Sequence, residues 1–391
     1  MKTLQTESYS RLLLTFSTLF IIALTWHISY PSNILVVGLG TILGIIYFKN
    51  PLPISPKTLS IIWGFTLLFV FFLMLNLTLY KSDFDLILAY IKKTGFSLLL
   101  FVFILLFYKT RKKLLAKSID YALIAIVSLW FIQLIGYYVT GHYLDVLEPI
   151  AGADRAQRYE AYFIQSVLPI NIIRPTSIFI EPGTYAVSTF PLLALSYLFH
   201  KRLTKLHIFV LASYFGTLSF FAWIISTLFI VTVGLANMEL KLTKKNLIII
   251  LIAIIAVVGI YEYYTFRFVT QHGTKAIALR EQVFHYWFAQ DSSGMLLGQG
   301  FANTIFSNRA VLEDVSFVVN VLFQYGIFAI PFFALLIYIS WGLPVLFLGI
   351  ILLTKLHPQI YVVWFYFAAL HLIQLQRKEL KHHSTEAPRS I

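Results

Sequence analysis

Apolar runs of roughly 20 residues, the length of helix that crosses the hydrocarbon core of a bilayer, recur along the whole chain. No other property of the sequence narrows the choice of fold as far. Backbone polar groups in that core must be satisfied within the protein, so runs of this length form helices when they span it. Only 12% of the residues are charged, about half of the roughly 25% found in soluble domains. The sequence therefore predicts an all-α, polytopic integral membrane protein.

We expect about 12 transmembrane helices, with about 11 to 13 consistent with the pattern, in a single membrane domain over residues 1–391. The first apolar run lacks a small-residue cleavage site and is interpreted as a retained span. The predicted spans lie near residues 12–29, 34–48, 59–79, 86–108, 119–140, 183–200, 206–219, 221–237, 247–263, 316–333, 335–354 and 358–375.

The net charge of +13 is explained by orientation in a membrane and needs no nucleic acid. With the N-terminus inside, 19 of the 30 Lys and Arg residues fall on the inner side and nine on the outer side. Such an excess of basic residues in cytoplasmic loops is the positive-inside rule. Because an even number of spans returns the chain to its starting side, we expect both termini in the cytoplasm, with a cytoplasmic tail over residues 376–391.

Two hydrophilic segments interrupt the apolar runs, and both face outward in this topology: residues 141–182, the first loop, and residues 264–315, the second loop. Seven of the nine outward basic residues lie in these two loops. Outer loops are normally poor in arginine, so this concentration indicates a function. The candidate functional residues are Arg158, Arg174 and Glu181 in the first loop and Arg267, Arg280, His285, Gly298, Gly300 and Asp314 in the second.

Missing residues and motifs exclude several kinds of chemistry. The chain contains no cysteine, which excludes disulfides, thiolate catalysis and cysteine-bound metal. It has no HExxH, GxSxG or P-loop motif, and its histidines show no ligand spacing, so we expect neither a metal nor a cofactor. The glycines of GLGTILG, residues 38–44, lie in an apolar run and are interpreted as close helix packing rather than a dinucleotide fingerprint.

The first loop ends in RPTSIFIEPG, residues 174–183, at the start of an apolar run. One interpretation is structural: proline favours the first turn of a helix, Glu181 meets the positive end of the helix dipole, and Arg174 anchors at the membrane interface. The other interpretation is functional, because the second loop carries a similar set in which Arg280 and His285 precede Trp287 and the stretch LLGQGF.

The stretch Arg174-Pro-Thr-Ser-Ile-Phe-Ile-Glu181-Pro resembles the R-x-x-x-x-F-x-E-P signature of bacterial O-antigen polymerases of the Wzy type. The run from Arg280 through Gly298-x-Gly300 to Gly326 is similar to the second-loop pattern of the wider O-antigen polymerase and ligase superfamily. The resemblance implies a GT-C-like fold and a metal-independent glycosyltransferase at the periplasmic face of the bacterial inner membrane. Its substrates would be oligosaccharides linked to undecaprenyl diphosphate, and a chain-length regulator and a flippase would be its partners.

The candidate residues suit that reaction on chemical grounds. Diphosphate is a good leaving group, so the main demand is charge stabilisation. Arginine forks bind phosphate bidentately, and we interpret Arg174 and Arg280 as a diphosphate clamp. Glu181 or Asp314 either accepts the proton of the attacking hydroxyl or positions an arginine, and both roles stay open for each. The predicted substrate-binding residues are Arg158, Arg267, His285, Gly298 and Gly300.

Two other functions are alternatives. Ligases of the superfamily often carry a His-Asn pair ahead of the glycine that corresponds to Gly326, whereas this chain has Asp314, Val315 and Ser316 there. A flippase or other transporter of lipid-linked oligosaccharides would show repeated halves, broken helices in matched positions and charges near the midplane. Here the charges concentrate in the two outer loops, which favours an enzyme.

Overall fold

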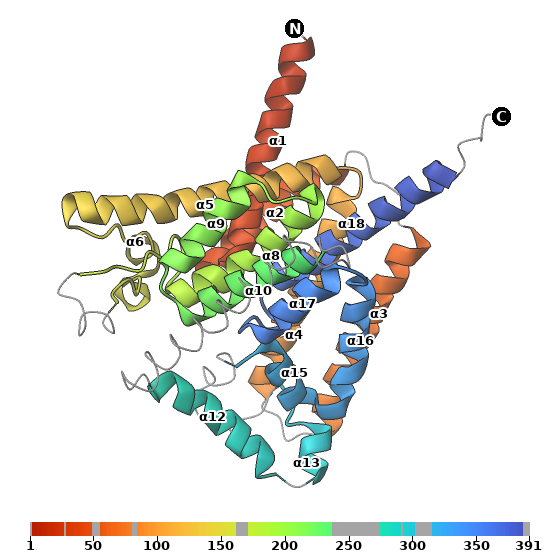
Figure 1. The fold of residues 1–391 in the computed structure, drawn as a ribbon. Helices are drawn as coiled ribbons and strands as arrows, with labels where there is room; N and C mark the ends of the chain where they lie inside the picture. The colour runs from red at the N-terminus through yellow and green to blue at the C-terminus, as the bar shows by residue number, and fades with distance from the viewer. Residues whose placement is uncertain are drawn as a thin grey trace, which may run out of the picture.

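A computed structural model describes residues 2–26, 29–48, 55–79, 84–161, 171–236, 274–290, 292–301 and 315–385. Within these ranges the chain is helical and forms no strand, and its β-type pairing is limited to an isolated bridge between Glu160 and Ile173. The prediction of an all-α protein is confirmed for this part of the chain. Figure 1 shows the helices packed around one another, with the first helix extending to the N-terminus at the top.

The helices before the first loop are α1 (Lys2–Thr25), α2 (Ser29–Phe48), α3 (Pro56–Thr78), α4 (Phe84–Tyr108) and α5 (Lys112–Thr140). The first loop contains the short helices α6 (Glu148–Ala151) and η1 (Ala153–Arg155). It is followed by α8 (Pro182–His200), α9 (Lys205–Gly216) and α10 (Phe220–Ala236). The described helices beyond it are α12 (Thr274–Phe288), α13 (Ser292–Leu297), α15 (Phe317–Tyr325), η3 (Gly326–Ala329), α16 (Ile330–Ile339), α17 (Pro344–Leu353) and α18 (Tyr361–Thr385).

Among the described residues, four helical segments are long and apolar enough to cross a membrane: Pro56–Thr78, Phe84–Tyr108, Lys112–Thr140 and Phe317–Ile339. Shorter apolar helices accompany them, at Tyr9–Thr25, Asn33–Ile46, Phe220–Ala236, Pro344–Leu353 and Tyr361–Gln376. These helices agree with the membrane protein that the sequence predicts. The total of about 12 spans and the GT-C-like arrangement stay predictions.

Helix α8 is the centre of the packed helices. It contacts α5, α9, α10, α17 and α18, and almost all of its side chains from Pro182 to Leu198 are buried. A helix that is apolar on all sides is expected in the interior of a bundle. The first loop leads directly into the N-terminus of α8, so the RPTSIFIEPG stretch is attached to the best-packed element of the structure.

Helix boundaries near the C-terminus differ from the predicted spans 316–333 and 335–354. The chain turns at Gly326, in the left-handed region with φ 52°, and continues through η3 into α16. The break between the two apolar segments lies at residues 340–343, where Gly342 has φ 90°, and α17 follows. Apolar periodicity does not locate these bends, because long apolar runs continue on both sides of each bend. The predicted tail, 376–391, continues α18 as helix to Thr385.

The predicted orientation can be tested by labelling, because the chain has no cysteine of its own. Ala153, Arg202 and Glu281 are exposed in the structure. The positive-inside rule places Ala153 and Glu281 outside and Arg202 inside. Cysteines at 153 and 281 should react with an impermeant maleimide in intact cells, and a cysteine at 202 should react only after lysis. Labelling of Arg202→Cys in intact cells, with protection of the other two, would show that the orientation is reversed.

Candidate functional site

The RPTSIFIEPG stretch folds as a tight turn that leads into α8. The backbone N–H of Phe179 donates to the Thr176 carbonyl at 3.0 Å. Ser177 has φ 55°, a left-handed backbone that non-glycine residues rarely adopt. Its hydroxyl donates to the Ile126 carbonyl of α5 at 2.6 Å, which offsets the strain. Glu181 then occupies the N-cap of α8 and Pro182 its first position, as the structural interpretation of the motif predicts.

Two buried glutamines fix this turn to α5. The side-chain oxygen Oε1 of Gln133, in α5, accepts hydrogen bonds from the backbone N–H groups of Thr176 at 3.2 Å and Ser177 at 2.7 Å. Its amide donates to the side chain of Gln157 at 3.0 Å. The Gln157 amide in turn donates to the Phe179 carbonyl at 2.9 Å. Because buried backbone groups are costly to leave unpaired, this network holds the motif in one conformation.

We expect Gln157→Ala to destabilise the protein by roughly 1–3 kcal/mol for each buried group left unpaired. The backbone N–H of Val146, which donates to Gln157 at 3.0 Å, and the Phe179 carbonyl would lose their partner. The measurement is the thermal unfolding temperature of the purified protein in detergent. Gln282→Ala, at an exposed position of α12, is the matched control. Equal unfolding temperatures for both variants would contradict the role given to the network.

Arg174 is held by a short neighbouring segment of the loop. Its backbone N–H donates to the Tyr159 carbonyl at 2.7 Å. Its guanidinium donates from Nε at 3.0 Å and from Nη2 at 2.6 Å to the Glu160 carbonyl. One residue before Tyr159, the N–H of Arg158 donates to the Ile180 carbonyl at 2.7 Å. Since extended chain advances only about 3.3 Å per residue, this segment brings the two ends of the motif close together.

Glu181 forms an ion pair with Lys355, which lies in the connection between α17 and α18. The Thr184 hydroxyl donates to the same carboxylate at 3.1 Å. Burial alone would raise the pKa of Glu181, but the charge and hydrogen bond of Lys355, the Thr184 hydroxyl and the charge of Arg158 together hold it below its usual value. Both partners are partly shielded, with side-chain exposures of 18% for Lys355 and 32% for Glu181. The Glu181 carboxyl group is therefore ionised at neutral pH.

The connection that carries Lys355 is held on both sides. The N–H of Phe317, at the start of α15, donates to the Thr354 carbonyl at 2.7 Å. On the other side, Nε1 of Trp364 donates to the Pro358 carbonyl at 2.6 Å. Position 355 is thus fixed against two helices, and Lys355 reaches Glu181 from a fixed backbone.

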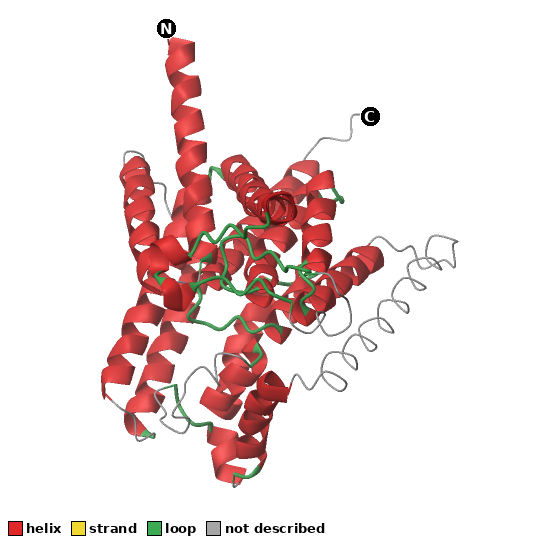
Figure 2. Cartoon of the chain, turned by 90° about the vertical axis from the view of Figure 1, so that its left-hand side faces the viewer, coloured by secondary structure: helices red, strands yellow, loops and turns green. Residues whose placement is uncertain are grey.

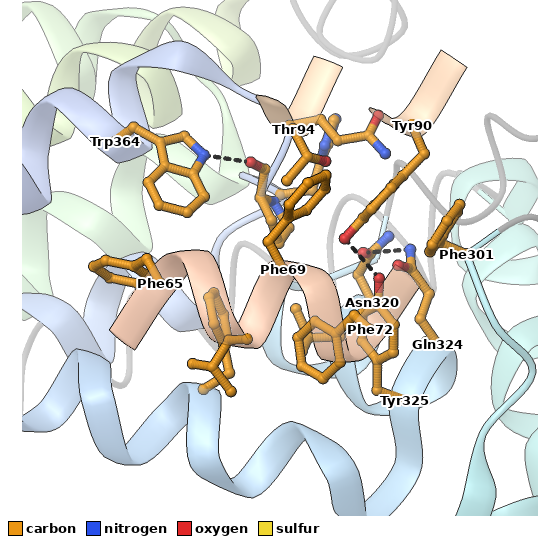
Figure 3. Close-up of a pocket in the computed structure, with 16 residues that line it drawn as sticks. Phe65, Phe69, Phe72, Tyr90, Thr94, Phe301, Asn320, Gln324, Tyr325 and Trp364 are labelled. Carbon is orange, nitrogen blue, oxygen red and sulfur yellow. Dashed lines mark hydrogen bonds between the residues drawn. The ribbon is translucent and has the colours of Figure 1, made fainter. Parts of the chain in front are cut away.

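The same connection borders a mostly apolar cavity of about 90 Å³. Figure 3 shows the hydroxyl groups of Tyr90 and Tyr325 meeting at one end of it, 2.8 Å apart. The amides of Gln324 and Asn320 are joined beside them at 2.9 Å. The lining comes from α3, α4, α15, α16, the start of α18, Phe301 and the connection after Lys355: Phe65, Leu68, Phe69, Phe72, Tyr90, Thr94, Phe301, Asn320, Val321, Gln324, Tyr325, Phe332, His357, Pro358, Gln359 and Trp364.

Gly298 and Gly300 lie where the second loop crosses the bend after α15. Gly298 has φ 79°, and a Cβ there would come within 2.6 Å of the backbone nitrogen of Gly326. The N–H of Gly300 donates to the Gln324 carbonyl at 2.8 Å. The close backbone approach accounts for a glycine at position 298. The substrate-binding role given to both glycines stays a prediction.

The remaining candidates of the second loop are placed only in part. Helix α12 carries Arg280 and an exposed His285 and packs on α15 through Val283. The structure says nothing of the Arg280 side chain, and Arg267 and Asp314 lie outside the described residues. Figure 1 draws α12 apart from α6 and the first loop. Joint action of Arg174 and Arg280 therefore stays a prediction.

Comparisons with protein-family models, with curated proteins and with solved structures find no match to this chain. The case for a function therefore rests on its own residues.

Sequence reasoning did not find three residues that organise the site. Lys355 is one of the nine outward basic residues, and its place between two apolar runs is a usable signal in the sequence. Gln133 is a polar side chain inside an apolar helix, which is costly unless it has a partner. Gln157 gave no signal, because glutamine is an ordinary residue in an exposed loop.

Proposed function

We propose that the protein is a polysaccharide repeat-unit polymerase of the O-antigen type, acting at the periplasmic face of the bacterial inner membrane. The observation that carries the proposal is the Glu181–Lys355 ion pair, with the charge of Arg158 beside it, at the N-terminus of α8. Glu181 lies in the stretch that resembles the polymerase signature, and the fold brings Lys355 to it from the connection between α17 and α18. A helix N-terminus lined with basic side chains suits an anionic substrate such as a diphosphate.

In the proposed reaction, a hydroxyl oxygen of a lipid-linked repeat unit attacks the anomeric carbon of a growing glycan. The bond from that carbon to the diphosphate of undecaprenyl diphosphate breaks, and the diphosphate leaves with the electron pair. The hydroxyl proton passes to a carboxylate or to water. Because negative charge develops on the leaving diphosphate, fixed cations beside it lower the activation barrier.

The basic residues divide into two roles in this proposal. Arg174 and Arg280 bind the diphosphate through their planar forks. Two donors of Arg174 are directed at the Glu160 carbonyl, which fixes the plane of the guanidinium before substrate binds. Lys355 and Arg158 add positive charge at the start of α8.

Glu181 serves mainly to position Lys355. A carboxylate whose pKa is held below its usual value is a weak proton acceptor, which favours an electrostatic role over general base catalysis. Asp314 remains the other candidate for the base. The apolar cavity beyond Lys355 offers a wall suited to the first isoprene units of the carrier lipid.

The proposal is tested by deleting the gene and separating the lipopolysaccharide on a gel. We expect a band of lipid A-core bearing one repeat unit, in place of the ladder of bands from long polysaccharide chains. The first repeat unit can still be attached to the core, but it cannot be extended. A bare core would instead indicate a ligase, a flippase or an earlier step of biosynthesis, and it would refute the polymerase.

A further inference from the structure

A second, polar pocket of about 230 Å³ lies between the end of α5 and the first loop. Figure 2 views this side of the molecule and shows the loop segments (green) gathered in front of the helices. The pocket is separate from the cavity beyond Lys355 and shares no lining residue with it. The polar and aromatic side chains that line it are Tyr137, His142, Tyr143, Tyr159, Glu160 and Asn171.

Two stacked tyrosines form one wall of this pocket. The rings of Tyr143 and Tyr159 are parallel within 8°, with centroids 3.8 Å apart. Tyr143 is anchored, because its hydroxyl lies 3.3 Å from that of Thr176 in the turn of the motif. Burial raises the pKa of Tyr143 to about 12, so the hydroxyl stays protonated at neutral pH. The pair is a rigid aromatic surface with polar edges.

Beside the tyrosines, the lining contains Ile172 and Ile173 and three further polar side chains, those of His142, Glu160 and Asn171. Among the described residues, the Glu160 carboxylate, the Asn171 amide and the His142 ring make no hydrogen bond or ion pair. The lining includes no lysine or arginine. An aromatic face with a carboxylate and an amide beside it suits a ligand with apolar C–H faces and many hydroxyl groups. The carboxylate, with no cation in the lining to offset it, disfavours an anionic ligand.

The pocket adjoins the predicted diphosphate clamp. Glu160 lines the pocket, and its backbone carbonyl accepts two hydrogen bonds from the Arg174 guanidinium. Tyr159, whose carbonyl accepts the N–H of Arg174, supplies half of the aromatic wall. A ligand in this pocket would therefore lie beside Glu160, the residue whose carbonyl holds the guanidinium predicted to bind the diphosphate.

We propose that this pocket binds one non-acidic pyranose unit of the glycan substrate and so selects which repeat units are joined. The inference rests on the proposed polymerase function and adds to it a sugar site with a defined preference. Glu160 would accept hydrogen bonds from sugar hydroxyls and would reject a uronic acid at the same position.

The test measures binding of a lipid-free glycan to the full-length protein in nanodiscs by saturation-transfer NMR. The probe is the repeat-unit oligosaccharide released from the organism's own carrier lipid by mild acid. We expect saturable binding to the wild type and about tenfold weaker binding to Tyr159→Ala, with Asn171→Ala also weakened. Tyr159→Phe, which keeps the ring, should bind within about twofold of wild type. Tyr138→Ala, at an exposed tyrosine outside the pocket, should match wild type.

Two results would overturn the sugar site: absence of oligosaccharide binding to the wild type, or equal binding to wild type and Tyr159→Ala. Lys355→Ala separates the site from the chemistry, because it should retain oligosaccharide binding while losing polymerisation. If the wild type binds the oligosaccharide through Tyr159 but never elongates lipid-linked repeats, the sugar site stands and the polymerase proposal fails.

Discussion

Replacing Arg174 by alanine is expected to slow polymerisation by roughly 100–1000-fold, the usual cost of one lost charge-stabilising donor at a developing anion. Arg280→Ala should have an effect of the same order if the two arginines share the diphosphate. Lysine should rescue either position poorly, because an ammonium cannot reproduce the planar fork. The readout is the length distribution of the polysaccharide at matched membrane abundance of each variant.

Arg155→Ala is the matched control, because Arg155 is exposed in the same loop. It should leave the ladder unchanged. A purely interfacial role predicts a different pattern, in which Arg174→Lys and Arg280→Lys both behave as wild type. Long ladders from both lysine variants would eliminate the clamp. A fall in unfolding temperature for Arg174→Lys alone would show instead that its contact with the Glu160 carbonyl stabilises the loop.

Breaking the Glu181–Lys355 pair should have the second large effect. Either Glu181→Ala or Lys355→Ala leaves a partly shielded charge without its partner and removes a group from the start of α8. We expect each single variant to lose about 100-fold in rate, and the double variant to lose little more, because the two residues act as one unit. Glu181→Asp and Lys355→Arg should keep part of the activity.

The pH dependence follows from the sign of the pKa shift. Because the pKa of Glu181 is lowered in the folded protein, the pair contributes its stabilisation above the ordinary carboxyl pKa of about 4.3 and loses it as pH falls through the lower folded value. Polymerisation should therefore show no loss from this carboxylate between pH 7 and about pH 5. For the substitutions themselves, a wild-type rate of polymerisation in Lys355→Ala would refute the catalytic role of the Glu181–Lys355 pair.

Much of the fold could be predicted because apolar length is a strong local signal. The end of α5 at Thr140 and the start of α8 at Pro182 coincide with features of the sequence: Gly141 is left-handed after α5, and Pro182 opens α8. The bend at Gly326 was not predictable in the same way, because it depends on Gly298 packing against it from a distant part of the chain.

The candidate site could be predicted only as a list of residues in sequence. The resemblance to the R-x-x-x-x-F-x-E-P signature assigns Arg174 and Glu181 to one site, but it gives no partner for either residue. The partner of Glu181 comes from 174 residues further along the chain. The partner of Arg174 is the backbone carbonyl of Glu160, and a pattern of side chains in the sequence does not reveal such a partner. Likewise, the left-handed Ser177 depends on acceptors in α5 that only the folded chain supplies.

The most direct measurement is polymerisation by the purified protein, with undecaprenyl diphosphate-linked repeat units as its only substrate. The assay contains EDTA and no nucleotide sugar, because the donor carries its own leaving group and the proposed cations are side chains. We predict a ladder of lipid-linked products at multiples of the repeat mass, with undecaprenyl diphosphate released as each bond forms. Repeat units that remain unextended, or that are extended only when a divalent metal or a nucleotide sugar is added, would contradict the proposed polymerase.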